Sequence, residues 1–129
     1  MKPERRFRQS VTKYLKGKLY IWAIHDSYQA GVPDHYYSGS GADLFCEYKY
    51  FPTDRTSFDL TRPPKKPALS RLQQQWLNDR YDQGRNVLVI VGMPSGGVIL
   101  RDKLWMQPTT VYDLSSRAEI ASEILRICT

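Results

Sequence analysis

A mostly apolar run in the first half of the chain contains two opposite charges. It extends from Leu44 to Tyr50, and its charged side chains are Glu47 and Lys49. Successive side chains of an extended strand alternate between its two faces, so Glu47 and Lys49 project together. Cys46 and Tyr48 then point to the other side. Because charges are rarely buried unless they are paired or bound to a metal, the run predicts a core strand with an acid and a base side by side.

A second acid, Asp34, lies shortly before this strand. Residues 34–38 predict a short strand, and a glycine-rich turn joins it to the strand at 43–50. Such an antiparallel hairpin brings Asp34 towards Glu47. Proteins usually hold Mg²⁺ or Mn²⁺ against a phosphate with two carboxylates, and water occupies other coordination positions of the ion. In the alternative interpretation, Asp34 is only a turn residue that follows a proline.

The N-terminal segment predicts a helix over residues 3–16 that adds a third acid. Pro3 suits the first turn, and the apolar stripe consists of Phe7, Val11, Tyr14 and Leu15. Glu4 lies three residues before Phe7 and seven before Val11, so it belongs to this inward-facing stripe. Alternatively, the helix dipole favours an acid in the first turn whatever its role.

The charge of the chain is basic and unevenly distributed. The 129 residues have a formal net charge of +6 and a pI near 9.4. Basic residues crowd the N-terminus and predict a cationic outer face on the first helix, which suits nucleic acid or an anionic membrane surface. A solvated helix surface explains them equally well. These residues are Lys2, Arg5, Arg6, Arg8, Lys13, Lys16 and Lys18.

Length and composition favour a single globular domain over residues 1–129, with 41% hydrophobic residues. No apolar run approaches the roughly 20 residues of a membrane span, and the N-terminus lacks the apolar segment of a signal peptide. We therefore expect no membrane partner and a cytoplasmic location, in a bacterium or a phage-infected cell. Cys46 and Cys128 are a poor basis for a disulfide, so both are expected to be reduced.

A second helix, which Ser70 opens, places Gln73 on its apolar stripe. The other residues of that stripe are Leu69, Leu72, Trp76, Leu77 and Tyr81. This position would direct Gln73 towards the sheet. However, Ser70 with Gln73 three residues later is also the pattern of a capping box, which requires no role in a site.

The remaining elements complete an α/β prediction. Residues 19–24 indicate a strand, residues 86–91 a strand that is apolar on both faces, and residues 98–101 another strand. The C-terminal helix begins near Ser116, with Glu119 as its capping partner, and buries Ile120, Ala121, Ile124, Leu125 and Cys128. This order of elements predicts a mixed sheet with helices on both faces.

Residues 52–68 form a Pro-rich, basic segment directly after the candidate site. Its prolines break regular structure, and loops of this length in compact domains tend to be functional or disordered. We interpret it as a mobile, substrate-facing flap, with an inert insertion as the alternative. The prolines are Pro52, Pro63, Pro64 and Pro67, and the basic residues are Arg55, Arg62, Lys65 and Lys66.

Several of these residues together form a recognisable pattern. It consists of Glu4 on a first helix, Gly31-Val32-Pro33-Asp34, Glu47-Tyr48-Lys49, Leu69-Ser70-Arg71-Leu72-Gln73 and Trp76-Leu77. The pattern resembles the PD-(D/E)xK nuclease superfamily, and within it the VRR-NUC branch of small nucleases. The likeness covers roughly residues 1–101 and leaves the C-terminal helix, at 113–128, outside the family core. It implies a restriction-endonuclease-like three-layer α/β/α core, with a central mixed β-sheet flanked by helices.

The resemblance also implies a metal site. Asp34 and Glu47 look like ligands of Mg²⁺ or Mn²⁺, with the backbone carbonyl of Tyr48 as a third ligand. Glu4 would bind through water or complete a second metal position. The long Pro-rich segment is a departure from compact relatives, which have a short connection there.

For catalysis, the resemblance implies that Lys49 orients or activates the attacking water and offsets charge on the pentavalent phosphorus. Gln73 would hydrogen-bond Lys49 or the nucleophile region. The expected reaction is hydrolysis of a phosphodiester in duplex or branched DNA, as a nick or a structure-specific cut, and the family usually leaves a 5′-phosphate. Relatives of this size often act as homodimers on branched DNA, and two cuts at one junction need two sites.

Two other functions remain open at this point. A non-catalytic DNA-binding module would explain the charge, but not a lysine and two acids that converge within apolar strands. A viral interaction protein would use an exposed aromatic surface drawn from Tyr28, Tyr36 and Tyr37. DNA affinity that falls steeply with salt separates the two, because phosphate contacts release counterions. His25 is interpreted as a strand-end or loop residue with a possible substrate contact.

Overall fold

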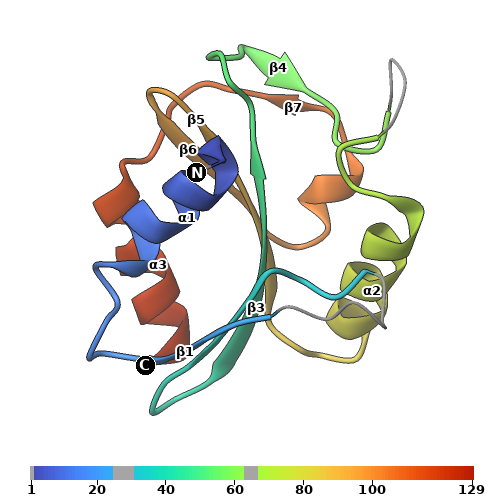
Figure 1. The fold of residues 1–129 in the computed structure, drawn as a ribbon. Helices are drawn as coiled ribbons and strands as arrows, with labels where there is room; N and C mark the ends of the chain where they lie inside the picture. Colours follow the sequence, from blue (N-terminus) through green and yellow to red (C-terminus); the bar gives the residue numbers. More distant parts are fainter. Residues whose placement is uncertain (1, 25–30, 63–66) are drawn as a thin grey trace.

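The computed structural model describes residues 2–24, 31–62 and 67–129. As predicted, a mixed sheet lies between helices (Figure 1). Its strand order is β1-β2-β3-β5-β6, in which β3 and β5 are parallel and the other neighbours antiparallel. The strands are β1 (Tyr20–Ala23), β2 (His35–Ser38), β3 (Asp43–Tyr50), β5 (Val87–Met93) and β6 (Gly96–Leu100).

Helices cover both faces of this sheet (Figure 1). Helices α1 (Pro3–Thr12) and α3 (Arg117–Cys128) pack on one face. Helix α2 (Arg71–Asp82) and the short 3₁₀ helix η1 (Leu104–Met106) pack on the other. Strand β5 is buried along its whole length, which confirms the prediction of a central strand.

The alternation predicted for β3 is present. Leu44, Cys46 and Tyr48 belong to the core against α1 and α3. Glu47 and Lys49 lie together on the face towards α2, where their side chains form an ion pair. Strand β3 therefore contributes an apolar face to one core and two charged groups to the other side of the sheet.

The capping boxes predicted for the second and third helices are both formed. Ser70 and Gln73 cap α2, and Ser116 and Glu119 cap α3. Residue Leu125 of α3, predicted to be buried, is only partly so. Cys46 and Cys128 are free and buried.

The predicted extent of the first helix was wrong. The helix ends at Thr12, not at residue 16, because the next amides bond to carbonyls three residues back: Tyr14 to Val11 and Leu15 to Thr12. This tighter turn leaves Tyr14 43% exposed, outside the apolar stripe. Leu72, predicted on the stripe of α2, is also exposed. It lies about 100° around the helix from Gln73, which faces the sheet.

The connections hold structure that the sequence did not predict. Within 52–68, β4 (Ser57–Phe58) pairs with β7 (Thr109–Thr110), so the prolines do not exclude regular structure there. Leu60 is buried and its carbonyl accepts a hydrogen bond from the Leu69 amide, which ties this segment to the start of α2. Strand β6 begins at Gly96, two residues before the predicted start at residue 98, because Gly96 and Gly97 already pair with β5. None of the helices described here is long and apolar enough to cross a membrane.

Candidate active site

The predicted site residues come from separate segments that meet near one end of β3. Asp34 lies immediately before β2, where the Ile24 amide bonds to its backbone carbonyl and extends the ladder with β1. The carboxylate of Asp34 reaches across to β3 and accepts a 2.9 Å hydrogen bond from the Tyr48 amide. The predicted hairpin is therefore confirmed, and it does bring Asp34 towards Glu47.

The approach to Asp34 depends on a close backbone contact. Gly31 has φ = +91°, and a Cβ atom at this position would lie 2.6 Å from the carbonyl oxygen of Leu72. Both the left-handed conformation and the lack of space require glycine. The segment that carries Asp34 into β2 thus starts against the first turn of α2, where Gln73 is located.

Glu47, Lys49 and Gln73 form one hydrogen-bonded network. The Lys49 ammonium lies 3.4 Å from Glu47 Oε2 and donates a 3.2 Å hydrogen bond to Gln73 Oε1. The Gln73 amide group in turn donates a 2.9 Å bond from Nε2 to Glu47 Oε2. The three side chains therefore hold one another in place from β3 and α2.

Gln73 fulfils both roles that its sequence position offered. Its Oε1 atom accepts the Ser70 amide at 2.9 Å, which is half of the capping box, and it also accepts the Lys49 ammonium. A carbonyl oxygen has two lone pairs, so the two bonds are compatible. The cap fixes the orientation of the amide group that contacts Glu47 and Lys49.

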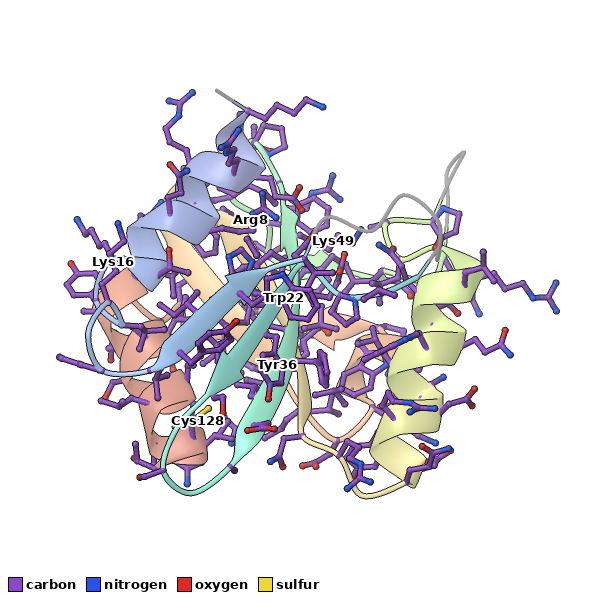
Figure 2. All side chains as sticks on the ribbon, turned by 60° about the horizontal axis from the view of Figure 1, so that its bottom comes forward. Arg8, Lys16, Trp22, Tyr36, Lys49 and Cys128 are labelled. Carbon is purple, nitrogen blue, oxygen red and sulfur yellow. The ribbon has the colours of Figure 1, made fainter. Side chains whose placement is uncertain are left out.

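Helix α1 adds two more charged residues at the same end of β3. Glu4 is half-buried and feels the charges of Asp34 and Lys49. Arg8, one turn further along the helix, pairs with Asp34 at 3.3 Å between Nη1 and Oδ1. The Arg8 side chain is only 15% exposed, and its Nε atom is buried without a hydrogen-bond partner among the described residues. Figure 2 shows Arg8 and Lys49 at the same end of the molecule.

The placement of Arg8 corrects one prediction and adds a residue that was missed. The sequence predicts Arg8 on the cationic outer face of the first helix, but its side chain points inward to Asp34. The signal was present in the sequence, because residues four apart share a helix face and Glu4 had already been assigned to the inner stripe. The positive charge of Arg8 offsets the negative charge of Asp34. Arg8 and the Tyr48 amide together fix the orientation of the Asp34 carboxylate.

Two acids of the site, Glu47 and Glu4, have a raised pKa, and burial is the largest cause for both. Burial, and after it the charge of Asp34, raises the pKa of Glu47 to about 8, against the opposing effect of Lys49. Burial and Asp34 also raise the pKa of Glu4. Negative charge is therefore disfavoured at these positions unless a cation is added. Clusters of perturbed groups of this kind are typical of functional sites.

The donor set fits a hard cation such as Mg²⁺ or Mn²⁺. Across the described ranges, no three His, Cys, Asp or Glu side chains lie close enough to hold a metal ion together. Mg²⁺, however, is commonly held by one or two carboxylates together with substrate phosphates and waters. Asp34 and Glu47 supply such a pair, and a cation would relieve the repulsion that raises the pKa of Glu47. The roles predicted for Glu4 and for the Tyr48 carbonyl stay predictions.

Two residues considered from the sequence, His25 and Tyr28, lie outside the described residues. His35 is buried, with its ring 5.6 Å from that of Tyr37 and 5.7 Å from that of Tyr48. Tyr37 itself is fully buried, so it cannot contribute to an exposed aromatic surface as predicted, whereas Tyr36 faces the other side of β2.

Comparison with known proteins identifies the fold. No protein-family model and no curated protein matches the chain. Among solved structures, Hjc from Archaeoglobus fulgidus covers 75% of this chain and 75% of its own, with a TM-score of 0.53 and 14% sequence identity. This chain has the fold of a Holliday junction resolvase. The likeness confirms the α/β fold predicted from the sequence, with helices on both sides of a mixed sheet.

Proposed function

We propose that this protein is a Mg²⁺- or Mn²⁺-dependent DNA endonuclease of the PD-(D/E)xK superfamily. The observation that carries the proposal is the anchoring of Lys49 by Glu47 and Gln73, beside Asp34. The fold lends further support, because Hjc is a Holliday junction resolvase, and that resolvase belongs to the same superfamily.

Asp34 and Glu47 are the residues that would hold the metal ion. The bound ion supplies positive charge at the scissile phosphate and lowers the pKa of water there. Asp34 is fixed by the Tyr48 amide and Arg8, and Glu47 by Gln73, so both carboxylates are oriented before substrate arrives. Such preorganisation is the main contribution of a protein to electrostatic catalysis.

Lys49 acts on the reacting phosphate. An ammonium group has three N–H donors, and in the described part of the chain Glu47 and Gln73 engage two of them. The third is available to donate to a phosphate oxygen or to the attacking water. The positive charge offsets the negative charge that develops as water bonds to phosphorus and the bond to the leaving oxygen breaks. The attacking water gives up one proton to solvent, the leaving 3′ oxygen takes up a proton from solvent, and a 5′-phosphate remains on the other product.

Branched DNA is the substrate we favour, and a homodimer the form that acts on it. A single site cuts one strand, so symmetric cleavage of a junction requires two copies related by a two-fold axis. The basic net charge of +6 suits a polyanionic substrate. A monomer that only nicks one strand is the simpler version of the same proposal.

A cleavage panel tests the proposal. Purified protein is incubated with duplex, flap, four-way junction and supercoiled plasmid DNA, with Mg²⁺, with Mn²⁺ or with EDTA. Lys49→Ala and Asp34→Ala are compared with Lys16→Ala and Asp113→Ala, which change the same residue types at exposed positions. We expect metal-dependent cleavage by the wild type and both control variants. In the two site variants the cleavage rate should fall about 100- to 1,000-fold, as when a group that stabilises the developing charge is removed.

The panel also separates the alternatives. Cleavage by Lys49→Ala and Asp34→Ala at the wild-type rate would exclude this site. A protein that binds DNA with steep salt dependence but cuts none of the substrates would be a non-catalytic binding module. Sedimentation of the protein with and without a four-way junction decides between the monomer and the dimer.

A further inference from the structure

Five aromatic side chains form a continuous row on the sheet face that carries Glu47 and Lys49. Adjacent ring centroids in this row lie 5.1 to 6.3 Å apart, which is the separation of interacting aromatic pairs. The row crosses three strands in register, since Trp22 pairs with Tyr36 and Tyr36 with Phe45. Its members are Tyr20 and Trp22 of β1, Tyr36 of β2, Phe45 of β3 and Trp76 of α2.

One end of the aromatic row is in solvent. Trp76 and Phe45 are partly buried against the apolar core between the sheet and α2, whereas Trp22 is 51% and Tyr20 63% exposed. An antiparallel strand with one face in water normally alternates apolar and polar side chains. Strand β1 instead turns Ile21 towards the core and presents both of its large aromatic rings to solvent. Core packing therefore does not account for Tyr20 and Trp22.

The aromatic row is continuous with the candidate active site. Phe45, Glu47 and Lys49 alternate along the same face of β3. Phe45 and Lys49 are four residues apart, so about 13 Å of strand separates the row from the ammonium group. Figure 2 shows Trp22 and Tyr36 on the face that leads to Lys49. A strand of nucleic acid with its phosphate at Lys49 would pass over these rings after a few nucleotides.

Cationic side chains accompany the rings. The guanidinium of Arg80 lies 5.8 Å from the centre of the Trp76 ring. Arg85 lines a pocket of about 560 Å³ together with Tyr36 and Phe45. The acid in this pocket, Asp43, accepts hydrogen bonds from the Tyr36 and Ser38 hydroxyls. Aromatic rings interleaved with basic groups are the usual platform for single-stranded nucleic acid, because bases stack while phosphates pair with cations.

We propose that the aromatic row stacks unpaired bases of a DNA strand whose scissile phosphate lies at Lys49. The inference rests on the proposed nuclease function and narrows its substrate to DNA with a single-stranded segment next to the cut, such as a flap or an opened branch. Trp22 and Tyr20 contact the bases, and Arg85 contacts the backbone. Stacking tolerates any base, so the row selects for unpaired structure and not for sequence.

A binding measurement without divalent metal tests this inference independently of cleavage. Fluorescence anisotropy of a labelled oligothymidylate is compared with that of an abasic strand of equal length, which keeps the phosphates but lacks the bases. Wild-type protein, in EDTA to prevent cleavage, serves as the parent. We expect it to bind the oligothymidylate about tenfold more tightly than the abasic strand, as one stacked base would give.

Variants of Trp22 locate the effect. Trp22→Ala should bind the oligothymidylate about tenfold more weakly and the abasic strand unchanged, while Trp22→Phe keeps most of the affinity. Tyr112→Ala removes an aromatic ring that is 88% exposed and lies outside the row, and should change neither. Circular dichroism confirms that each variant is folded.

Three results would overturn the inference. The first is equal affinity of the parent for the oligothymidylate and the abasic strand. The second is an equal loss of affinity for the oligothymidylate in Trp22→Ala and Tyr112→Ala. The third is a dimer that Trp22→Ala converts to a monomer with unchanged DNA affinity, since the row would then be an interface between copies. The proposed nuclease function can fail separately, through absence of metal-dependent cleavage, while base stacking is still measured.

Discussion

The two faces of the central sheet use the same strand in opposite ways. On the face against α1 and α3, β3 contributes Cys46 and Tyr48 to a closed apolar core, in which the Tyr37 and Tyr48 hydroxyls meet at 2.7 Å. On the other face, it contributes Glu47, a buried acid whose pKa is raised. Alternation along a single strand therefore separates packing groups from charged groups. We call the face against α1 and α3 the closed face, and the face towards α2, to which β3 adds Glu47 and Lys49, the open face. The open face also has an apolar core, but the buried charge of Glu47 costs stability there.

A cavity in the closed face should produce the largest loss of stability. Leu44→Ala removes a fully buried side chain of β3 and should lower the free energy of unfolding by about 3 kcal/mol. Urea denaturation of the metal-free protein measures this. Leu104→Ala, at a position 44% exposed, is the control and should lower the free energy of unfolding much less. Cleavage per folded molecule should be unchanged in Leu44→Ala, and a large loss of activity without a loss of stability would contradict the separation of the two faces.

A change at Gln73 should affect the open face while the fold stays intact. Gln73→Glu keeps a residue type that completes a capping box, so the cap of α2 should be retained. It removes the Nε2 donor to Glu47 and adds a like charge beside it. We expect cleavage to fall about 10- to 100-fold, as when a partner of a metal ligand is lost. Gln75→Glu, at an exposed position of the same helix, is the matched control. Unchanged cleavage in Gln73→Glu would limit Gln73 to a capping role.

The cost of the charge on Glu47 should be measurable in metal-free protein. Its pKa is about 8 in the folded state against an ordinary value of 4.5, so the folded state binds the proton more tightly than the unfolded chain. Stability therefore falls as pH rises from about 4.5 to 8. Glu47→Gln removes this dependence and should be more stable than the wild type at pH 8, by about 1–2 kcal/mol. Thermal unfolding in EDTA at several pH values measures the difference.

Glu123→Gln is the control with the opposite sign. Its hydrogen bond with Arg126 lowers the pKa of Glu123, so the native carboxylate contributes stability that is lost as pH falls. Replacing Glu123 should thus destabilise the protein slightly near neutral pH, since the group is close to the surface. If Glu47→Gln and Glu123→Gln changed stability in the same direction at pH 8, the electrostatic contrast between the two sites would be wrong.

Local sequence patterns predicted most of the fold and the positions of several candidate site residues. The pairing of Glu47 with Lys49 follows from the two-residue period of a strand, and the inward position of Gln73 follows from helical spacing. The same rules predicted the caps at Ser70 and Ser116, because capping depends on residues only three apart. Each of these predictions used contacts between neighbours in sequence.

Contacts between distant segments were beyond this reasoning. The pairing of β4 with β7 joins residues about fifty positions apart, and no local sequence pattern predicts it. The partner of Arg8 is Asp34, which is visible only after α1 has been placed against the end of the sheet. The aromatic row was missed for the same reason, since cross-strand register decides that Trp22, Tyr36 and Phe45 adjoin.

The close contact between Gly31 and Leu72 links the two halves of the candidate site mechanically. Asp34 comes from the N-terminal hairpin and Gln73 from a helix nearly forty residues later, yet the backbones of Gly31 and Leu72 lie too close for a side chain between them. Because residue 31 has no side chain that could be compressed, the distance between its segment and the first turn of α2 can change little. A substitution at residue 31, which takes no part in the chemistry, would therefore change the distance between Asp34 and Gln73.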